Sequence, residues 1–290
     1  MSIETPLLEL LQFPFMQRAL IGGLLTGALG GVLGSFAVLR QLSFFSDALG
    51  HSALLGITLG ILLGLNPTLV LIPFAVVFAL GVNHLVQRSQ LPADALLNII
   101  YSSSLALAVV ALSFVRSYRG SIHQLLFGDI LGVSWLDLGL IASLLVVAVG
   151  YLALTRRDQI LLTLDEPLAL SRGVAVPVHR LLFIVLLAVV VAISIKAVGV
   201  LLISAFVVIP ACASRLVSRH FNTYVVLASV LGGVCAVLGL LVSGGVRSAL
   251  WPLRGDCPAG RFPRGVGAGA VSHRTRPGPR GAPVSDSVAK

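Results

Sequence analysis

Residues 181–213 read LLFIVLLAVVVAISIKAVGVLLISAFVVIPACA, an apolar run broken only by Lys196 and Gly199. About 20 apolar residues in a helix cross the hydrocarbon core of a bilayer, so this run is too long for one straight crossing. Gly199 offers a natural break near its middle. We therefore predict two short membrane spans that meet at Val198–Gly199.

Six further apolar segments repeat this pattern along the chain. They lie near residues 19–39, 49–65, 68–86, 96–115, 134–154 and 224–243. Within lipid a helix satisfies its own backbone hydrogen bonds. The sequence thus predicts an all-α, polytopic transmembrane helix bundle of about eight spans, formed by residues 1–244.

The composition excludes an ordinary soluble domain. The chain is 57% hydrophobic and 11% charged, with a mean hydropathy of +1.02, whereas soluble domains carry about 25% charged residues. The first ten residues hold Glu4 and Glu9 in place of the basic start of a signal peptide. We expect the first apolar run to remain in the protein as a span.

The net charge of +9 belongs mainly to the end of the chain. Residues 1–244 hold 12 Lys/Arg against 9 Asp/Glu, and residues 245–290 hold 8 against 2. The spans are therefore nearly neutral, and no nucleic-acid-binding surface is indicated.

The arginines indicate the orientation of the bundle. If the crossings alternate, one side collects Arg40, Arg88, Arg156, Arg157, Arg172, Arg180, Arg215 and Arg219. The other side collects Arg18, Arg116, Arg119 and Lys196. Since cytoplasmic loops carry the excess of Lys and Arg, we expect the loop 155–180 in the cytoplasm.

Glycines recur at four-residue spacing in the first two spans. They are Gly23, Gly27 and Gly31, with Gly30 and Gly34 beside them, and then Gly56, Gly60 and Gly64. A row of missing side chains leaves a groove into which a neighbouring helix packs. The pattern predicts close helix contacts.

Asp47 and His51 are an ionisable pair at the start of the second span, LRQLSFFSDALGHSALLGITLG, residues 39–60. Their i, i+4 spacing places them on one helix face with Cβ atoms about 5–6 Å apart. Ionisable groups inside hydrocarbon are costly and tend to mark a pathway, a partner or a cavity. A carboxylate oxygen with an imidazole nitrogen suits Zn, Mn or Fe(II).

Two interpretations of this pair stay open on spacing alone. Either the side chains bind a metal, or they lie at the membrane surface, with Asp47 stabilised by the positive end of its helix. A transition metal takes about four to six donors, so a metal site also needs other residues, water or a second copy. A homodimer would supply two Asp and two His.

Most other candidate ligands are isolated, and we expect structural roles for them. His84, His179 and His220 flank spans, His123 and Asp129 lie in a loop, His273 lies in the tail, and Asp137 precedes a span. Interfacial anchoring suits the histidines, and helix capping suits both aspartates. The cysteines Cys212, Cys235 and Cys257 form no metal motif and are expected to be small buried residues.

The longest polar connection is TRRDQILLTLDEPLALSRGVAVPVHRLLF, residues 155–183. It predicts a short helix from Asp165 to Ser171, with Pro167 in its first turn and Gly173 just past its end. Taken alone, it is typical of a cytosolic surface helix.

Four segments in this order resemble the membrane permease subunit of zinc, manganese and iron ABC importers. They are residues 39–60, LLFGDILGVSW (125–135), LDEPLALSRGVAVPVHRLLF (164–183) and KAVGVLLISAFVVIPACASRLVS (196–218). The likeness covers about residues 15–244. It implies that Asp47 and His51 lie on the metal path of an ATP-driven importer in the bacterial cytoplasmic (inner) membrane.

The resemblance also implies a set of partners. The segment 165–176 is expected to be a coupling helix that docks on a separate cytosolic ABC ATPase, through Asp165, Glu166, Leu168, Leu170 and Gly173. Two permease copies would work with an ATPase dimer and an extracytoplasmic metal-binding protein. This chain would then bind no cofactor and catalyse no reaction, with ATP on the partner subunit.

Residues 245–290 depart from the family pattern, which continues into one more apolar span. They are rich in Gly, Pro and Arg, show no apolar period and are predicted to be a basic disordered tail. This mixture is typical of a GC-rich gene read out of frame. We therefore expect a frameshift near Gly244 or Gly245.

Two other functions compete with the importer. A proton-coupled secondary transporter could use Asp47 and His51 as a relay without any ATPase. An intramembrane enzyme is disfavoured because the spans contain no paired carboxylates, no HExxH and no GxSxG. Neither lysine, Lys196 or Lys290, follows Gly as a P-loop requires, so any ATPase of that type resides on another chain.

Overall fold

The computed structural model describes residues 13–65, 67–89, 91–113, 128 and 132–250. Ten helices follow one another in this part of the chain, and eight are long and apolar enough to cross a membrane. The eight are α2 (Pro14–Leu39), α3 (Phe45–Leu62), α4 (Pro67–Arg88), α5 (Ala93–Ser113), α7 (Trp135–Leu154), α10 (Val176–Val198), α11 (Val200–Val217) and α12 (Phe221–Leu250). The predicted all-α bundle of eight spans is confirmed.

The long apolar run forms two helices, as predicted. Gly199 ends α10 and begins α11 with φ +89° and ψ 160°, a backbone conformation that residues with a Cβ rarely adopt. The break falls at the predicted position because glycine is the one residue there that permits it at low cost.

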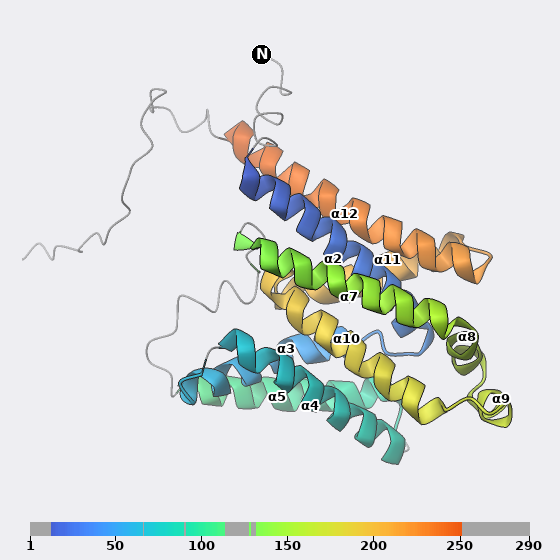
Figure 1. Cartoon of the computed structure of the whole chain (residues 1–290). Helices are drawn as coiled ribbons and strands as arrows, with labels where there is room; N and C mark the ends of the chain where they lie inside the picture. The colour runs from blue at the N-terminus through green and yellow to red at the C-terminus, as the bar shows by residue number, and fades with distance from the viewer. Residues whose placement is uncertain (1–12, 66, 90, 114–127, 129–131, 251–290) are drawn as a thin grey trace, which may run out of the picture. The chain divides into compact units, whose positions relative to one another are not determined.

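Helices α2, α3 and α10 form the centre of the bundle. Between 61% and 72% of the residues in their most apolar windows are buried, against 17–33% in the other five spans. Phe45, Leu33 and Phe183 are among the largest fully buried side chains. Figure 1 shows α10 between the group α2, α11 and α12 and the group α3, α4 and α5.

The glycines of α2 set two close helix contacts, as their spacing predicted. A Cβ atom at Gly27 or Gly31 would overlap a carbonyl oxygen of α12, at Gly232 and Ala228 respectively. A Cβ atom at Gly34 would overlap the carbonyl oxygen of Val207 in α11. Figure 1 shows α2 and α12 side by side along their length.

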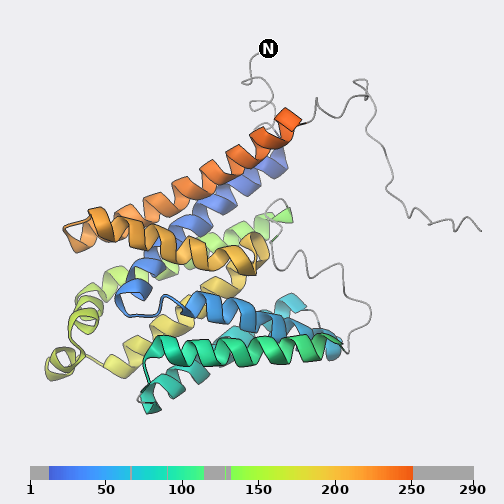
Figure 2. The same cartoon turned by 180° about the vertical axis from the view of Figure 1, so that it is seen from behind.

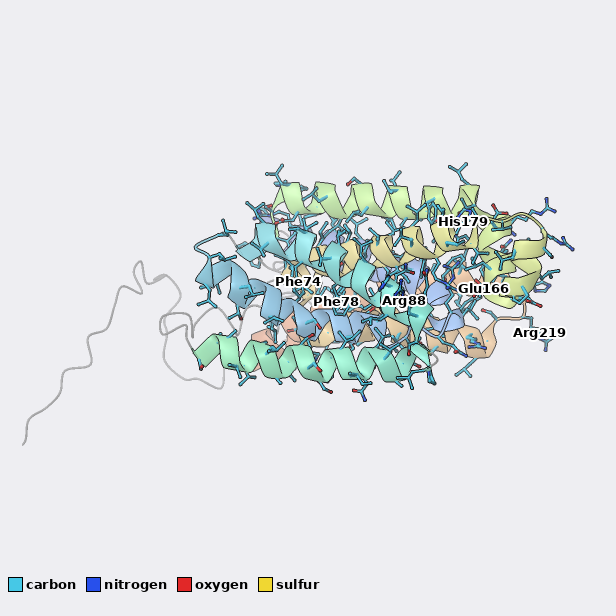
Figure 3. All side chains as sticks on the ribbon, turned by 90° about the horizontal axis from the view of Figure 1, so that it is seen from below. Phe74, Phe78, Arg88, Glu166, His179 and Arg219 are labelled. Carbon is cyan, nitrogen blue, oxygen red and sulfur yellow. The ribbon has the colours of Figure 1, made fainter. Side chains whose placement is uncertain are left out.

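Two short helices, α8 (Arg156–Leu164) and α9 (Glu166–Ser171), connect α7 to α10. Together they mark one end of the bundle, called here the α8–α9 end. Figure 3 shows Arg88, Glu166, His179 and Arg219 towards this end, away from Phe74. The predicted gathering of arginines on one side agrees with this arrangement.

The cysteines differ from expectation. Cys212 and Cys235 are exposed on α11 and α12, so the prediction of buried residues is wrong for both. On a membrane span the outer face meets lipid, where an apolar thiol is as well accommodated as in a core. Cys257, His123, Asp129 and His273 lie outside the described residues.

Candidate functional site

Asp47 and His51 stand together on the first two turns of α3. The Nε2 atom of His51 lies 3.9 Å from Oδ1 of Asp47. Their side chains are 15% and 28% exposed, for His51 and Asp47 respectively, so both can be reached from outside the chain. The helix begins at Phe45, four residues before the predicted start of the span, and both side chains therefore belong to the membrane-spanning helix.

An aromatic side chain of α5, Tyr101, packs against the imidazole of His51. The rings of His51 and Tyr101 meet edge to face, with centroids 4.9 Å apart and an angle of 88° between their planes. Tyr101 also contacts Phe44, the residue before α3, at 5.7 Å between centroids. The sequence spacing did not indicate this contact, because it joins residues on different helices.

The pair is an incomplete metal site by itself. Among the described residues, no group of three or more His, Cys, Asp or Glu side chains lies close enough to hold a metal ion. One carboxylate and one imidazole leave at least about two ligand positions of a transition metal to be filled from elsewhere.

The predicted short helix at the α8–α9 end is present. Asp165 caps α9, its Oδ1 accepting a hydrogen bond of 3.2 Å from the backbone N–H of Leu168. The helix ends at Ser171, and Gly173 follows with φ +77°. The predicted coupling segment 165–176 therefore contains one helix of six residues, a turn, and the first residue of α10.

The outer surface of α9 is apolar, and its inner side is held to the bundle. The side chains of Leu168 and Leu170 are 42% and 54% exposed, whereas Ala169 between them is buried. Glu166 forms an ion pair with Arg180 of α10. An exposed leucine pair on an anchored helix is suited to contact another protein.

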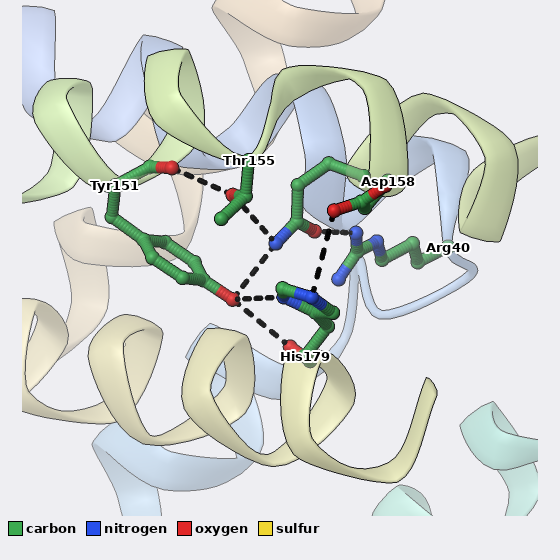
Figure 4. A network of polar contacts seen from close by, with 6 residues as sticks. Arg40, Tyr151, Thr155, Asp158 and His179 are labelled. Atoms are coloured by element: carbon green, nitrogen blue, oxygen red, sulfur yellow. Dashed lines mark hydrogen bonds and ion pairs between the residues drawn. The ribbon is translucent and has the colours of Figure 1, made fainter. Parts of the chain in front are cut away.

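Helix α8 is fastened by a buried polar network that the sequence did not reveal (Figure 4). The Gln159 side chain is fully buried, and its Nε2 donates to the hydroxyl of Tyr151 at 2.8 Å and to that of Thr155 at 3.2 Å. Its Oε1 accepts from the guanidinium of Arg40 at the end of α2. His179 of α10 contacts the Tyr151 hydroxyl through Nδ1 at 3.2 Å.

Arg40 ties α2 to α8 and α10. Its Nε donates to the Thr163 hydroxyl at 3.4 Å, and its guanidinium carbon lies 4.4 Å from the centre of the Phe183 ring. Burial lowers the pKa of Arg40 to about 10, so the side chain stays cationic at neutral pH. The structure thus gives His179 and Arg40 structural roles.

Asp137 at the opposite end takes part in capping α7, as predicted, but Ser134 is the N-cap residue and Asp137 is the third residue of the helix. Its carboxylate accepts from the backbone N–H of Ser134 at 3.0 Å, and the Ser134 hydroxyl accepts from the N–H of Asp137 at 3.2 Å. The same carboxylate binds Lys196 of α10 at 2.7 Å. The capping pattern was visible in sequence, whereas the ion pair to a distant lysine was not.

Eight apolar helices, one of which carries an ionisable pair, define a polytopic membrane protein. The chain belongs to the ABC 3 transport family, whose model matches residues 12–250.

Curated relatives and solved structures agree with this family. The chain is 30% identical over 234 residues to the manganese transport system membrane protein MntC of Listeria monocytogenes, covering 81% of this chain and 83% of the relative. It is 31% identical over 250 residues to the high-affinity zinc uptake system membrane protein ZnuB of Haemophilus influenzae, covering 86% and 96%. A structure of PsaBC from Streptococcus pneumoniae in complex with Fab superposes with a TM-score of 0.68 at 25% identity, covering 83% and 94%.

Proposed function

We propose that this chain is the permease subunit of an ATP-driven ABC importer that moves a divalent transition metal, such as manganese, zinc or iron, across the bacterial cytoplasmic membrane. The observation that carries the proposal is the contact between Asp47 and His51 within a span of an ABC 3 family member. The names of the manganese and zinc relatives support the class of cargo.

Asp47 and His51 are proposed to bind the metal ion as it crosses. Oxygen and nitrogen donors together suit Mn, Zn and Fe(II) better than Ca or Mg, which prefer oxygen alone. Each chain supplies two donors, so we propose a homodimer in which two Asp and two His surround one ion near the twofold axis. The partial exposure of both side chains supports a site shared between copies.

The α8–α9 end is proposed to face the cytoplasm, because eight arginines gather there. Leu168 and Leu170 then dock on a separate ABC ATPase, while Asp165, Glu166 and Gly173 hold the helix in position. Arg40 and Gln159 connect the preceding helix, α8, to α2. An extracytoplasmic binding protein delivers the metal at the opposite end, and the two sides open alternately.

Metal uptake in the Asp47→Asn and His51→Gln variants tests the proposal. Each substitution removes one donor at nearly constant size, so uptake of Mn²⁺ or Zn²⁺ should be lost while membrane abundance stays normal. The matched control is His84→Gln, which changes an exposed histidine on α4 and should leave uptake unchanged. Normal uptake in both Asp47→Asn and His51→Gln would contradict the metal role.

The energy source is tested in proteoliposomes that contain the permease and its ATPase. Uptake should require ATP and should continue when a protonophore removes the proton gradient. Uptake driven by the proton gradient without ATP would instead favour the secondary transporter.

A further inference from the structure

Helix α5 exposes a polar edge within its membrane span. Asp94, Asn98 and Ser102 follow one another at four-residue spacing, and all three are exposed. The Asn98 and Ser102 side chains make no hydrogen bond to a described residue, whereas the Ser113 hydroxyl donates to the Val110 carbonyl of its own helix. An amide that faces hydrocarbon without a hydrogen-bond partner is costly, so this edge is suited to water.

The remaining exposed surface of α5 is mainly apolar, with Ser103 as an exposed hydroxyl between Ile99 and Leu107. At 3.6 residues per turn, the polar edge covers an arc of about 80°, and Ile99, Leu107 and Val110 cover a second arc of similar width beside it. These three side chains are 57%, 57% and 58% exposed. Farther along the polar arc, beyond Ser102, Val109 is 64% exposed. The polar edge is thus confined to the first half of α5.

This first half of α5 lies between the Asp47–His51 pair and the α8–α9 end. Tyr101 contacts both His51 and Phe44, so the start of α3 is level with the third turn of α5. The eight residues of α5 before Tyr101 extend about 12 Å farther, at 1.5 Å per residue. Ala93 at their end lines a 340 Å³ cavity together with Glu166. Figure 2 shows α3 beginning farther from the α8–α9 end than α5 does.

We infer that Asp94, Asn98 and Ser102 line the water-filled segment of the metal path between the Asp47–His51 pair and the cytoplasm. The inference rests on the proposed function. A hydrated divalent ion that leaves the pair meets a hydroxyl, an amide oxygen and finally a carboxylate. Neutral oxygen donors hold borderline metals more weakly than imidazole does, and conduction needs sites weak enough to release the ion.

Thiol labelling in inside-out membrane vesicles tests this path. Cys212, Cys235 and Cys257 are first replaced by alanine, and single cysteines are then introduced by Asn98→Cys and Ser102→Cys. The matched controls are Ile99→Cys and Val110→Cys on the apolar arc. The probe is a membrane-impermeant cationic methanethiosulfonate, applied to the assembled permease and ATPase and scored per mole of monodisperse protein recovered.

The Asn98→Cys and Ser102→Cys variants should react at least about tenfold faster than the controls, because the reactive thiolate forms in water and not in hydrocarbon. Added Mn²⁺ should slow their labelling. Labelling rates equal to those of the controls would overturn the path along α5. If the unsubstituted permease still takes up metal, the proposed function is unaffected by that result. Fast labelling that neither Mn²⁺ nor Zn²⁺ slows would show that neither metal occupies this path. That result would contradict both the inference and the metal cargo of the proposed function.

Discussion

Gly34 shows at the scale of one residue how the bundle reaches its packing distance. A Cβ atom there would overlap the carbonyl oxygen of Val207, and backbone atoms cannot move aside as a flexible side chain can. Gly34→Ala should therefore separate α2 from α11 and lower stability by about 1–3 kcal/mol, the usual cost of overpacking. The measurement is thermal unfolding of the purified permease in detergent.

Gly139 of α7 provides the control for this substitution. It is exposed, and a Cβ atom there would meet nothing within 4 Å. Gly139→Ala should be neutral or stabilise the helix by about 0.5–1 kcal/mol, since alanine loses less backbone entropy. Equal destabilisation by the two substitutions would contradict the packing role of Gly34.

Single residues were predictable from sequence where the pattern is local. The i, i+4 spacing of Asp47 and His51 was enough to place their side chains together, and Asp137 was identified as a cap. Partners distant in sequence were not predictable. The contacts of His51 with Tyr101 and of Arg40 with Gln159 depend on how helices pack, which neither spacing nor composition specifies.

At the scale of elements, α9 was predictable from local sequence signals, whereas α8 depends on partners distant in sequence. Pro167 and Gly173 predicted the bounds of α9 because both act within a single turn. Helix α8 carries no comparable signals, and its sequence RRDQILLTL is too polar to resemble a span. Its position depends on Gln159, whose partners come from the end of α2 and from α7.

The exposed leucines of α9 give the element a testable role. Leu168→Glu with Leu170→Glu should release the ATPase from the purified complex, because two carboxylates would be buried against an apolar surface without partners. The measurement is co-purification of the ATPase with the tagged permease.

The control for α9 is Leu216→Glu with Val217→Glu at the end of α11. These residues are 89% and 76% exposed, so the double substitution adds the same charge to another apolar pair. It should leave co-purification unchanged. Retention of the ATPase by the α9 variant, or equal loss in both variants, would rule out specific docking through α9.

At the scale of the whole molecule, the described residues end together with α12, at Leu250. This helix continues to Leu250, so no change of secondary structure marks residue 244, the predicted end of the spanning domain. The family match also extends to residue 250. The predicted disordered tail lies mostly outside the described residues, and its origin in a frameshift stays a prediction. Another reading frame after codon 244 should then encode an apolar run of about 18–20 residues.

The number of copies around the metal is the remaining question at this scale. One chain brings Asp47 and His51 together but no third donor among the described residues. Losing even a residue that only orients a ligand typically costs about 10–100-fold in metal affinity. A shared site should therefore fail when one copy lacks both donors, whereas two separate sites would each keep working.

Mixed dimers distinguish a shared site from separate sites. Two copies with different tags are co-expressed, one unchanged and one carrying Asp47→Asn with His51→Gln, and complexes that hold both tags are purified with the ATPase. After reconstitution, their Mn²⁺ uptake should fall at least about tenfold below that of unchanged dimers carrying the same two tags, because two of the four donors are gone. Uptake at half the unchanged rate would show that each copy transports metal alone. Failure to recover any complex with both tags would contradict the homodimer itself.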